Sequence, residues 1–588
     1  MTAPTIRRRQ PGAPGEFAAD VHPVLRRVYA ARGLHTDADL DLSLERLLPV
    51  GSLEGVDAAA RLLAAHRAAG RVLVIGDFDA DGATSTALVV RGLRALHFAH
   101  ADFLVPNRFQ FGYGLTPEIV ALAAATRRPS LIVTVDNGVS SVAGVEAARE
   151  LGIPVLVTDH HLPGTELPRA DVIVNPNLAD ARFASAALAG VGVSFYVIAA
   201  LARHLGQDDF RAAELLDLVA LGTVADVVPL DRNNRILVAQ GLRRIRAGRC
   251  VPGIRALLEA ANRRLEQITA ADLGFAVAPR LNAAGRLTDM SVGIACLLAD
   301  DPAEAVRLAA MLDKLNEERR EIEQRMQLEA LDIAAGLRFG DDGGEALGLC
   351  LFDESWHQGV VGLVAGRIKD RWNRPVIAFA RAEDGSLRGS ARSISGVNIR
   401  DALESIARQH PGLIGKFGGH AMAAGMSMAE ENLAVFRPAF AAEIAARADR
   451  ESLQGVIHSD GALSGTELSL DTARVLRGAG PWGQGFPEPV FDGDFQIMDA
   501  RIVGGRHLKM QLVASDGGGA RAGAARAGVP GGGDAIEAIA FGYVGGVAEH
   551  PELRSGARIE LAYRLEVNEY RGLERLQMNC QHLRLAGH

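Results

Sequence analysis

The sequence is poor in cysteine and in aromatic residues, and it contains no long apolar run. The four cysteines, Cys250, Cys296, Cys350 and Cys580, are scattered, with no pair at C-x-x-C spacing. They indicate neither a zinc site nor a disulfide framework, and this usage is typical of a cytoplasmic protein. No stretch reaches the roughly 18 apolar residues of a membrane span, and no apolar region of a secretory signal follows the basic residues 7–9.

A basic surplus is also missing. Lysine and arginine number 63 against 71 aspartate and glutamate, which gives a formal net charge of −8. Nucleic-acid-binding proteins are often basic, so this total weighs mildly against that class. It does not exclude the class, because carboxylates around metal ions add negative charge that the ions neutralise. The 588 residues, 48% of them hydrophobic, are enough for about three or four domains.

What the sequence does contain is a short apolar run that stops in acidic residues. Residues 72–75 are rich in β-branched side chains and predict a buried strand, and residues 84–96 have the apolar spacing of a helix. Between them lie three acids at alternate positions, Asp77, Asp79 and Asp81. A single aspartate after a strand is usually a helix cap or a turn residue. Three so close together repel one another unless they hold cations.

The alternation of strands and helices continues along the chain. Further strands are predicted at 101–105, 131–135, 155–158 and 172–174, with helices between them. This alternation implies a parallel sheet, in which every loop after a strand opens at the same edge. Two of these loops carry ligand-type side chains, Asp136-Asn137 in one and Asp159-His160-His161 in the other. Their convergence with the first acidic segment predicts a ligand site at that edge.

Residues 186–300 are predicted to be helical, and one apolar helix ends at Asp226. The helix dipole disfavours a carboxylate at a helix C-terminus, so Asp226 points to a nearby cation, with a solvated carboxylate as the alternative. Residues 301–335 predict a long charged helix that separates two lobes. Residues 346–450 predict a second α/β unit, and the strands after residue 490 predict a small OB-like barrel.

The second unit contains a weaker candidate site. Ser390 and Arg392 lie on a glycine-flanked strand, and residues 415–425 are expected to be a glycine-rich loop leading into a helix whose N-terminus binds an anion. Packing of the glycines is an equally good interpretation. Basic and aromatic residues in the barrel suggest single-stranded nucleic acid, with core aromatics and surface charge as the alternative. The glycine- and alanine-rich residues 516–533 are expected to form a flexible loop.

Taken together, these motifs resemble the DHH phosphoesterase superfamily. The resemblance is carried by residues 77–82, 135–138, 159–161 and 221–230, and by residues 357–362 and 418–420, which are similar to its DHHA1-type domain. With an OB-like module appended, the chain resembles most the RecJ-like exonucleases of bacteria. That family implies a hydrolase that degrades single-stranded DNA from the 5′ end, releasing mononucleotides, with two Mn²⁺ or Mg²⁺ ions, in DNA recombination and repair.

The resemblance also implies roles for individual residues. The metal ligands would be Asp79, Asp81, Asp136, His160 and Asp226. The catalytic residues would be His161, as a donor or general acid at the scissile phosphate, and Asp77, which would orient a ligand or a water. The substrate-binding residues would be Arg108, Arg280, Asn282, Arg286, Ser390, Arg392 and His420, with Ser390 and Arg392 at the terminal 5′ phosphate.

The expected fold class is α/β: a parallel-sheet DHH domain joined by a long helix to a second α/β (DHHA1-type) domain, followed by an OB-like β-barrel. The predicted divisions are a tail with the first helices at 1–45, the DHH catalytic domain at 46–300, the connecting helix at 301–338, the DHHA1-type substrate-binding domain at 339–450 and the OB-like nucleic-acid-binding domain at 451–588. DNA is expected to thread between the two α/β lobes.

Two alternatives stay open. One is a small-substrate member of the same superfamily, a nanoRNase or a cyclic-dinucleotide phosphodiesterase, although such proteins typically lack the barrel. The other is a non-catalytic DNA-binding scaffold, which the intact set of ligand residues opposes. The family further implies a monomer with no membrane contact, and a single-stranded-DNA-binding protein and a recombination helicase as candidate partners. Some relatives carry a further C-terminal domain, and this sequence ends just after the barrel, at His588.

Overall fold

The computed structural model describes residues 4–13, 15–107, 111, 113–336, 347–515, 535–543, 553–570 and 572–585. The chain divides into two compact units. The larger comprises residues 6–285, 289–313 and 457–588, and the smaller comprises residues 1–5, 286–288 and 314–456. Helix α14 (Pro302–Gly336) belongs to both, and it confirms the long charged helix predicted for this segment.

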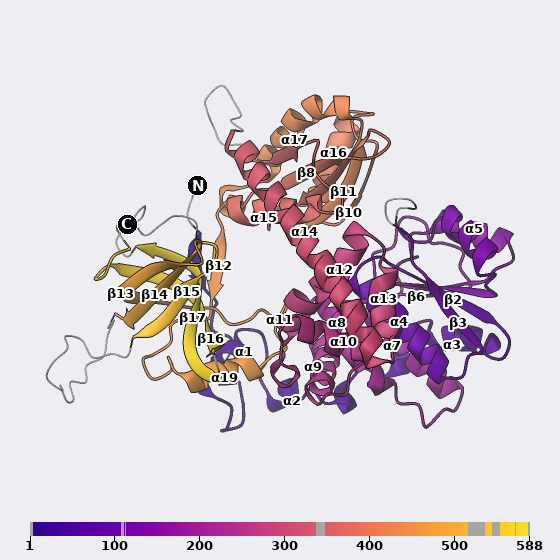
Figure 1. The fold of residues 1–588 in the computed structure, drawn as a ribbon, viewed down its shortest axis with the longest axis horizontal. Coiled ribbons are helices and arrows are strands. Elements are labelled where there is room, and N and C mark those ends of the chain that lie inside the picture. The colour runs from indigo at the N-terminus through magenta and orange to yellow at the C-terminus, as the bar shows by residue number, and fades with distance from the viewer. Residues whose placement is uncertain are drawn as a thin grey trace. The chain divides into compact units, whose positions relative to one another are not determined.

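The larger unit contains a parallel sheet with the strand order β3-β2-β4-β5-β6 (Figure 1). Its strands are β2 (Arg71–Gly76), β3 (His100–Leu104), β4 (Leu131–Val135), β5 (Val155–Thr158) and β6 (Val172–Val174). The central strands are buried along nearly their whole length, as their unbroken apolar sequences predict. Because all five strands are parallel, their carboxyl ends lie at one edge.

Helices pack against this sheet and continue beyond it. Helices α5 (Pro117–Thr126) and α6 (Val142–Glu150) pack on the side to which Leu73, Ile75 and Ile132 point. The other helices of this unit are α1 (Pro23–Ala30), α2 (Asp37–Leu40), α3 (Val56–Ala65), α4 (Ala80–Ala95), α7 (Gly190–His204), α8 (Leu216–Ala225), α9 (Arg232–Arg246), α10 (Pro252–Ala260), α11 (Ala270–Asp272), α12 (Ala278–Leu287), α13 (Ser291–Leu298) and α19 (Leu470–Gly478). Helix α8 is buried and contacts α4, α7 and α9. Within the described residues, no helix combines the length and the apolar character that crossing a bilayer requires.

The smaller unit is a five-stranded mixed sheet with the order β10-β11-β9-β8-β7. Its strands are β7 (Leu349–Phe352), β8 (Val376–Arg381), β9 (Leu387–Arg392), β10 (Lys416–Gly419) and β11 (Ala423–Met428). Helix α15 (Val361–Trp372) packs with part of α14 on one side, and α16 (Ile399–Gln409) and α17 (Leu433–Arg447) pack in a second core. This sheet with its helices confirms the prediction that the chain contains a second α/β domain.

One prediction for the smaller unit is wrong. Residues 416–428 form the hairpin β10–β11, in which Gly418 lies opposite Gly425, and not a loop that leads into a helix. The burial alternates, with Ala424, Met426 and Met428 facing the core, which is the two-residue period of a strand. The small residues hid this period, because alanine and glycine carry little periodic signal. The segment therefore supplies no helix N-terminus for an anion.

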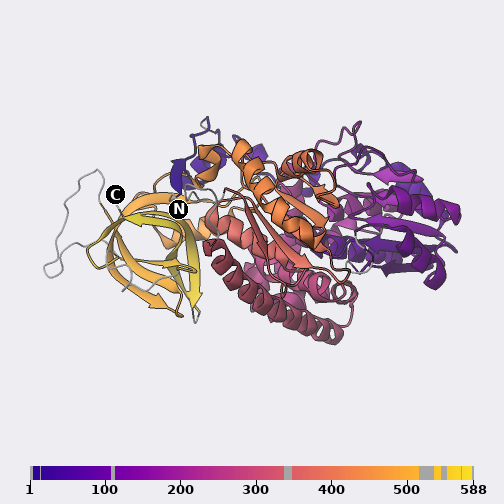
Figure 2. The ribbon, with the colours of Figure 1, turned by 90° about the horizontal axis from the view of Figure 1, so that it is seen from above.

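The C-terminal strands close into a barrel, which confirms the OB-like prediction (Figures 1 and 2, orange to yellow). The strands are β13 (Phe491–Val503), β14 (His507–Ala514), β15 (Ile536–Ala540), β16 (Arg558–Tyr570) and β17 (Leu573–Leu585). Strand β13 pairs with both β14 and β16, and β15 closes the ring by pairing in parallel with β17. The predicted flexible loop at 516–533 lies outside the described residues.

Helix α1, near the start of the chain, is fastened to the segment that precedes the barrel. Arg32 and Asp460 form a pair at 2.7 Å, and the two side chains are only 2% and 1% exposed. Arg27 pairs with Glu467, also at 2.7 Å. The Tyr29 hydroxyl donates to a main-chain carbonyl of this segment, at Ala479, over 2.9 Å. The N-terminal helix is therefore a structural part of the region that carries the barrel.

Candidate metal centre

The acidic segment after β2 is organised by the start of helix α4. The helix begins at Ala80, earlier than the predicted start at Thr84, because Asp79 caps it: Asp79 Oδ1 accepts a hydrogen bond from Gly82 N at 3.0 Å. Asp81 therefore lies in the first turn of a helix and not in a loop, which corrects the sequence-based expectation. The early start turns the Asp81 side chain into the protein interior, where it is 1% exposed.

Asp81 is held by the N-terminus of a second helix, α7. Gly190 N donates to Asp81 Oδ2 at 2.7 Å, and Val191 N donates to Asp81 Oδ1 at 3.0 Å. A Cβ on Gly222 of α8 would lie 2.7 Å from the same Oδ1, so only glycine fits there. Burial and the charge of Asp79 raise the pKa of Asp81 to about 7, although the two N–H donors oppose that change. An ionised Asp81 therefore requires a nearby cation.

Asp136, directly after β4, is buried in a strained conformation. Its φ is +62°, in the left-handed region that non-glycine residues seldom adopt and that is frequent at functional sites. A Cβ on Gly190 would stand 2.6 Å from Asp136 Oδ1, so the carboxylate lies directly on the start of α7. Burial, together with the charges of Asp81 and Asp79, raises the pKa of Asp136 well above its ordinary value.

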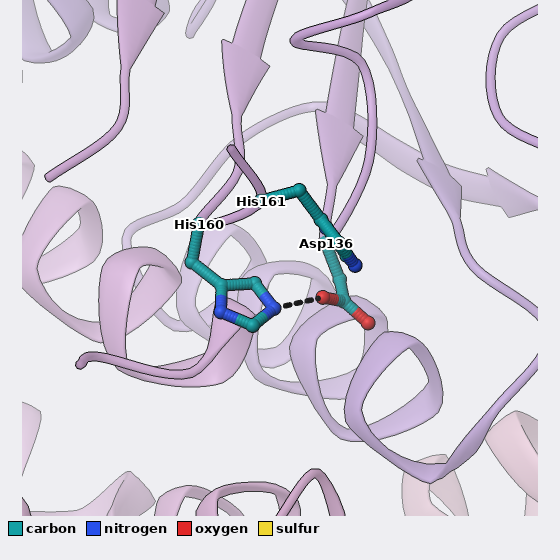
Figure 3. Close-up of side chains that lie close together, drawn as sticks. All are labelled: Asp136, His160 and His161. Atoms are coloured by element: carbon teal, nitrogen blue, oxygen red, sulfur yellow. Dashed lines mark ion pairs between the residues drawn. The ribbon is translucent and has the colours of Figure 1, made fainter. Parts of the chain in front are cut away.

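His160 lies between two of the acids. Its Nε2 is 3.1 Å from Asp136 Oδ1 and 3.4 Å from Asp226 Oδ2, and Figure 3 shows the ring directed at Asp136. Burial and the charge of His161 lower the pKa of His160 to about 4, so the imidazole is neutral near pH 7. Neutral imidazole is the form that binds metals. Asp226 caps the C-terminus of α8 as predicted, and burial followed by the charge of Asp81 raises its pKa well above its usual range.

Three sets of residues each bring their donor atoms within 4.8 Å of one another. The sets are Asp77, Asp79 and Asp136; Asp81, His160 and Asp226; and Asp136, His160 and His161. Asp136 Oδ1 and His160 Nε2 are among the buried side-chain atoms of the described residues that form no hydrogen bond, although they face each other at 3.1 Å. Buried polar atoms are costly when they lack a partner. Carboxylates with one neutral imidazole are a donor set that suits a divalent cation such as Mn²⁺, so the residues present fit this metal.

His161 has the opposite protonation behaviour from its neighbour. Its Nδ1 lies 2.8 Å from Asp159 Oδ1. Burial lowers the pKa of His161, but the hydrogen bond and the charge of Asp159 outweigh it and raise the pKa to about 9. The imidazole is therefore protonated near pH 7. The Tyr113 hydroxyl lies 3.4 Å from this ring and donates to the Asp136 carbonyl at 3.4 Å.

Tyr113 is a residue of the site that sequence reasoning missed. In the glycine- and aromatic-rich segment that contains it, the sequence-based prediction is Arg108 alone, which lies outside the described residues. The ring of Tyr113 also packs edge-on against Phe78, with 6.1 Å between centroids. Gly190 and Val191 were missed as well, because no local signal links them to an acid more than a hundred positions away.

Asn282 and Arg280, both predicted to bind substrate, lie on α12. Asn282 Oδ1 accepts the N–H of Ala80 at 2.9 Å, which ties α12 to the acidic segment. Arg280 is 6% exposed and pairs with Asp313 at 2.7 Å. The charge of Arg280 is thus used inside the fold, and its contact with phosphate stays a prediction.

In the smaller unit, Ser390 and Arg392 lie together at the end of β9. Arg392 Nη1 donates to Ser390 Oγ at 3.0 Å. A Cβ on Gly362 would lie 2.8 Å from Ser390 Oγ and 2.9 Å from Arg392 Nη2, so both side chains reach the first turn of α15. Burial lowers the pKa of Arg392. His420 lies on the turn of the β10–β11 hairpin, and Arg286 Nη1 contacts the Gly359 carbonyl at 3.5 Å.

Three family models match the chain. The DHH family, N-terminal domain, matches residues 71–223, the DHHA1 domain matches residues 344–446, and the RecJ OB domain matches residues 459–582. Each match falls inside one of the predicted domains, whose boundaries stay predictions.

Relatives match over almost the whole length. The single-stranded-DNA-specific exonuclease RecJ of Escherichia coli (strain K12) is 52% identical over 584 residues, which cover 97% of this chain and 98% of that protein. The crystal structure of RecJ in complex with Mn²⁺ from Thermus thermophilus is similar with a TM-score of 0.78 and 32% identity, over 97% of this chain and 77% of that one. The corresponding structure in complex with Mg²⁺ gives a TM-score of 0.72 and 31% identity, over 97% and 76% of the two chains.

Proposed function

The chain belongs to the RecJ family of the DHH superfamily, and from this we propose that it is a metal-dependent exonuclease that hydrolyses single-stranded DNA. It acts from the 5′ end, releases mononucleotides and serves recombination and repair. The observation that carries the proposal is the convergence of carboxylates and a neutral imidazole from four separate segments of the chain into three overlapping groups, with the donor atoms of each group within 4.8 Å of one another. The crystal structures of relatives with Mn²⁺ and with Mg²⁺ support the same class of cofactor.

We assign the metal ligands to Asp79, Asp81, Asp136, His160 and Asp226, for two divalent ions. Asp136 and His160 each belong to two of the three donor sets. The mixed carboxylate and imidazole set favours Mn²⁺ over an all-oxygen Mg²⁺ shell. When bound, such a pair of ions activates water and stabilises the leaving oxygen of an in-line displacement. The N-terminus of α7 fixes the Asp81 carboxylate, through the N–H groups of Gly190 and Val191, before any ion binds.

His161 is the proton donor of this proposal. It is protonated near pH 7 because Asp159 holds Nδ1, and its ring faces the Tyr113 hydroxyl and the acids. A protonated imidazole beside the scissile phosphate donates a hydrogen bond to it, or a proton to the leaving group. Asp77 is assigned an orienting role next to Asp79 and Asp136.

The terminal 5′ phosphate is assigned to Ser390 and Arg392. A half-buried guanidinium and a hydroxyl at the first turn of α15 place a cation, a donor and the positive end of a helix dipole together. His420, Arg286, Asn282 and Arg280 are proposed as further substrate-binding residues, and so is Arg108. Recognition of the end phosphate would make the enzyme an exonuclease, because an internal nucleotide offers no terminal group to that site.

We assign to the barrel the binding of the single-stranded DNA. It carries Phe541, 60% exposed and edge-on to His507 at 5.3 Å, the kind of surface on which bases stack. A single-stranded-DNA-binding protein and a recombination helicase are proposed partners, and a monomer is the proposed state.

One assay tests the proposed function. Labelled single-stranded DNA, double-stranded DNA and a cyclic dinucleotide are each incubated with Mn²⁺, and then with EDTA. Release of mononucleotides from the single strand alone, stopped by EDTA, is the expected result. Preferential cleavage of the cyclic dinucleotide would favour the small-substrate alternative, and binding without cleavage would favour a non-catalytic scaffold.

A further inference from the structure

The most exposed aromatic side chain in the described part of the chain lies on a π-helical turn. Phe275 is 82% exposed, whereas Leu273, Ala276 and Val277 of the same turn, η5 (Leu273–Val277), are buried. π-Helical turns are rare and are frequently found at functional sites. The extra residue of the turn is what rotates Phe275 out of the core while its neighbours stay inside.

The turn is held firmly. Arg280 Nη1 donates to the Ala276 carbonyl at 2.6 Å, and Arg280 Nη2 is fixed in turn by Asp313 at 2.7 Å. This buried arginine therefore braces the carbonyl next to Phe275. A side chain presented by a braced turn loses little entropy when it binds a ligand.

The position of the turn connects it to the candidate metal centre. Turn η5 packs on α8, the helix that ends at Asp226. A Cβ on Gly274 would lie 3.1 Å from Val224 Cγ1, and Val224 is two residues before Asp226. On the other side of Asp226, Val227 is 64% exposed with a φ of +61°. Helix α12, which directly follows the turn, reaches the acidic segment through Asn282.

The segment before the turn reaches the barrel. Arg264 Nη1 pairs with Glu569 Oε1 of strand β16 at 3.1 Å. The stretch from Arg264 to Val277 thus contacts the barrel at one end and the helix of Asp226 at the other.

We propose that Phe275 is a stacking platform for a nucleobase of the single strand on its way to the metal centre. This rests on the proposed function and adds a positioning residue to it. A nucleobase is the occupant that fits, because one exposed ring offers a flat π-face for any base. A protein partner would need about 800 Å² of surface on this side, far more than one ring offers. Phe275 does not touch the reacting atoms; it fixes how far the strand has advanced.

The test measures binding of the full chain in EDTA, so that hydrolysis does not interfere. Phe275→Ala, Phe275→Leu and Phe275→Trp are compared with the wild type by fluorescence anisotropy on 5′-phosphorylated strands in which a single abasic site is moved one nucleotide at a time. One stacked base contributes about 1–3 kcal/mol, so Phe275→Ala is expected to bind the intact strand about 5- to 150-fold more weakly.

The abasic scan separates stacking from a general structural effect. The wild type is expected to lose affinity when the abasic site reaches one particular position, and Phe275→Ala is expected to show no additional loss there. Phe275→Trp should bind the strand as tightly as the wild type, and the strand should quench the fluorescence of the added tryptophan. Phe275→Leu, which has no aromatic ring, should bind as weakly as Phe275→Ala. Val306→Ala, at a side chain 54% exposed, is the matched control and should behave as the wild type.

The proposal is overturned if Phe275→Ala binds every strand as the wild type does, or if its abasic profile is the same as that of the wild type. Hydrolysis of single-stranded DNA with Mn²⁺ by the wild type is measured separately. A wild type that hydrolyses the strand while Phe275→Ala shows no defect in binding would overturn this inference alone. A wild type that does not hydrolyse would overturn the proposed function, while the binding scan would still decide the role of Phe275.

Discussion

The acidic edge of the first sheet and the Ser390–Arg392 site use the same backbone parts for opposite charges. In both, a charged side chain meets the first turn of a helix: Asp81, from the start of α4, meets α7, and Arg392, at the end of β9, meets α15. A helix N-terminus favours an anion. At α7 the protein supplies that anion itself, and then adds more acids than two N–H groups can neutralise, so the site needs cations. At α15 it adds a half-buried cation instead, so the site favours an anion from outside.

The largest effect should come from removing one member of the acidic edge. Asp136→Ala is expected to lower hydrolysis of single-stranded DNA by on the order of 1,000-fold or more, because bound metal contributes several kcal/mol to such reactions. Binding of the strand should change little. Release of labelled nucleotides is the measurement, and Asp471→Ala, at a side chain 87% exposed, is the control. Near-normal hydrolysis by Asp136→Ala would show that this carboxylate is not a metal ligand.

The Ser390–Arg392 site should respond only to the chemistry of the strand end. Arg392→Ala is expected to lower kcat/KM on 5′-phosphorylated strands by about 10- to 100-fold, the value of one charge-assisted hydrogen bond, and much less on strands with a 5′ hydroxyl. Arg388→Ala, on the same strand with 49% of its side chain exposed, should leave both rates unchanged. Equal losses on the two kinds of strand would mean that Arg392 acts through the fold and not on the phosphate.

The acidic site should also respond to pH, through Asp81. Asp81 has a pKa of about 7, far above its ordinary value, so the folded metal-free protein holds a proton there that the unfolded chain releases. Stability from this group is therefore present at low pH and is lost as pH rises toward about 7. Metal binding displaces the proton, so Mn²⁺ affinity should rise by up to about tenfold per pH unit through that window. Calorimetry in buffers of different ionisation enthalpy measures the released protons, and their absence would contradict the assignment of Asp81 as a ligand.

The smallest effect is expected in the barrel, where binding is spread over many contacts. Phe541→Ala should weaken binding to long strands by about fivefold, the lower end of the range for one stacked base, and should leave cleavage of very short strands unchanged. Leu151→Ala, at a residue 55% exposed just after the first sheet's helix α6, is the control. A comparable loss on short strands would indicate damage to the metal centre and not to the grip of the barrel.

Much of this architecture can be predicted from the sequence because the signals are local. The β-branched run before Asp77 predicts a buried strand from local sequence alone, and parallel strands bring Asp136 and His160 to the same edge. The individual ligand roles of these residues came from the family resemblance and stay proposals. The apolar pattern that ends at Asp226 likewise predicted the helix that positions it.

What could not be predicted depends on distant contacts or on weak periodic signals. The N–H groups of Gly190 and Val191 hold Asp81 across more than a hundred residues. The hairpin at 416–428 was taken for a helix because its alanines and glycines suit either structure, and only packing of Met426 on the sheet decides. Burial of Arg280 depends on Asp313, a partner on another helix. The exposure of Phe275 depends on a π-helical turn, and the apolar spacing of the sequence does not predict such a turn.

The contacts between α1 and the segment before the barrel have a consequence for folding during translation. Arg27 and its partner Glu467 are 440 positions apart. At a synthesis rate of about 5–20 residues per second, helix α1 leaves the ribosome roughly 20–90 seconds before that partner exists. Throughout this interval Arg27, Tyr29 and Arg32 lack the partners that they have at Glu467, Ala479 and Asp460 in the finished protein. The N-terminal helix therefore gains these contacts only near the end of translation. A chain released before that point would present α1 without them to chaperones and proteases.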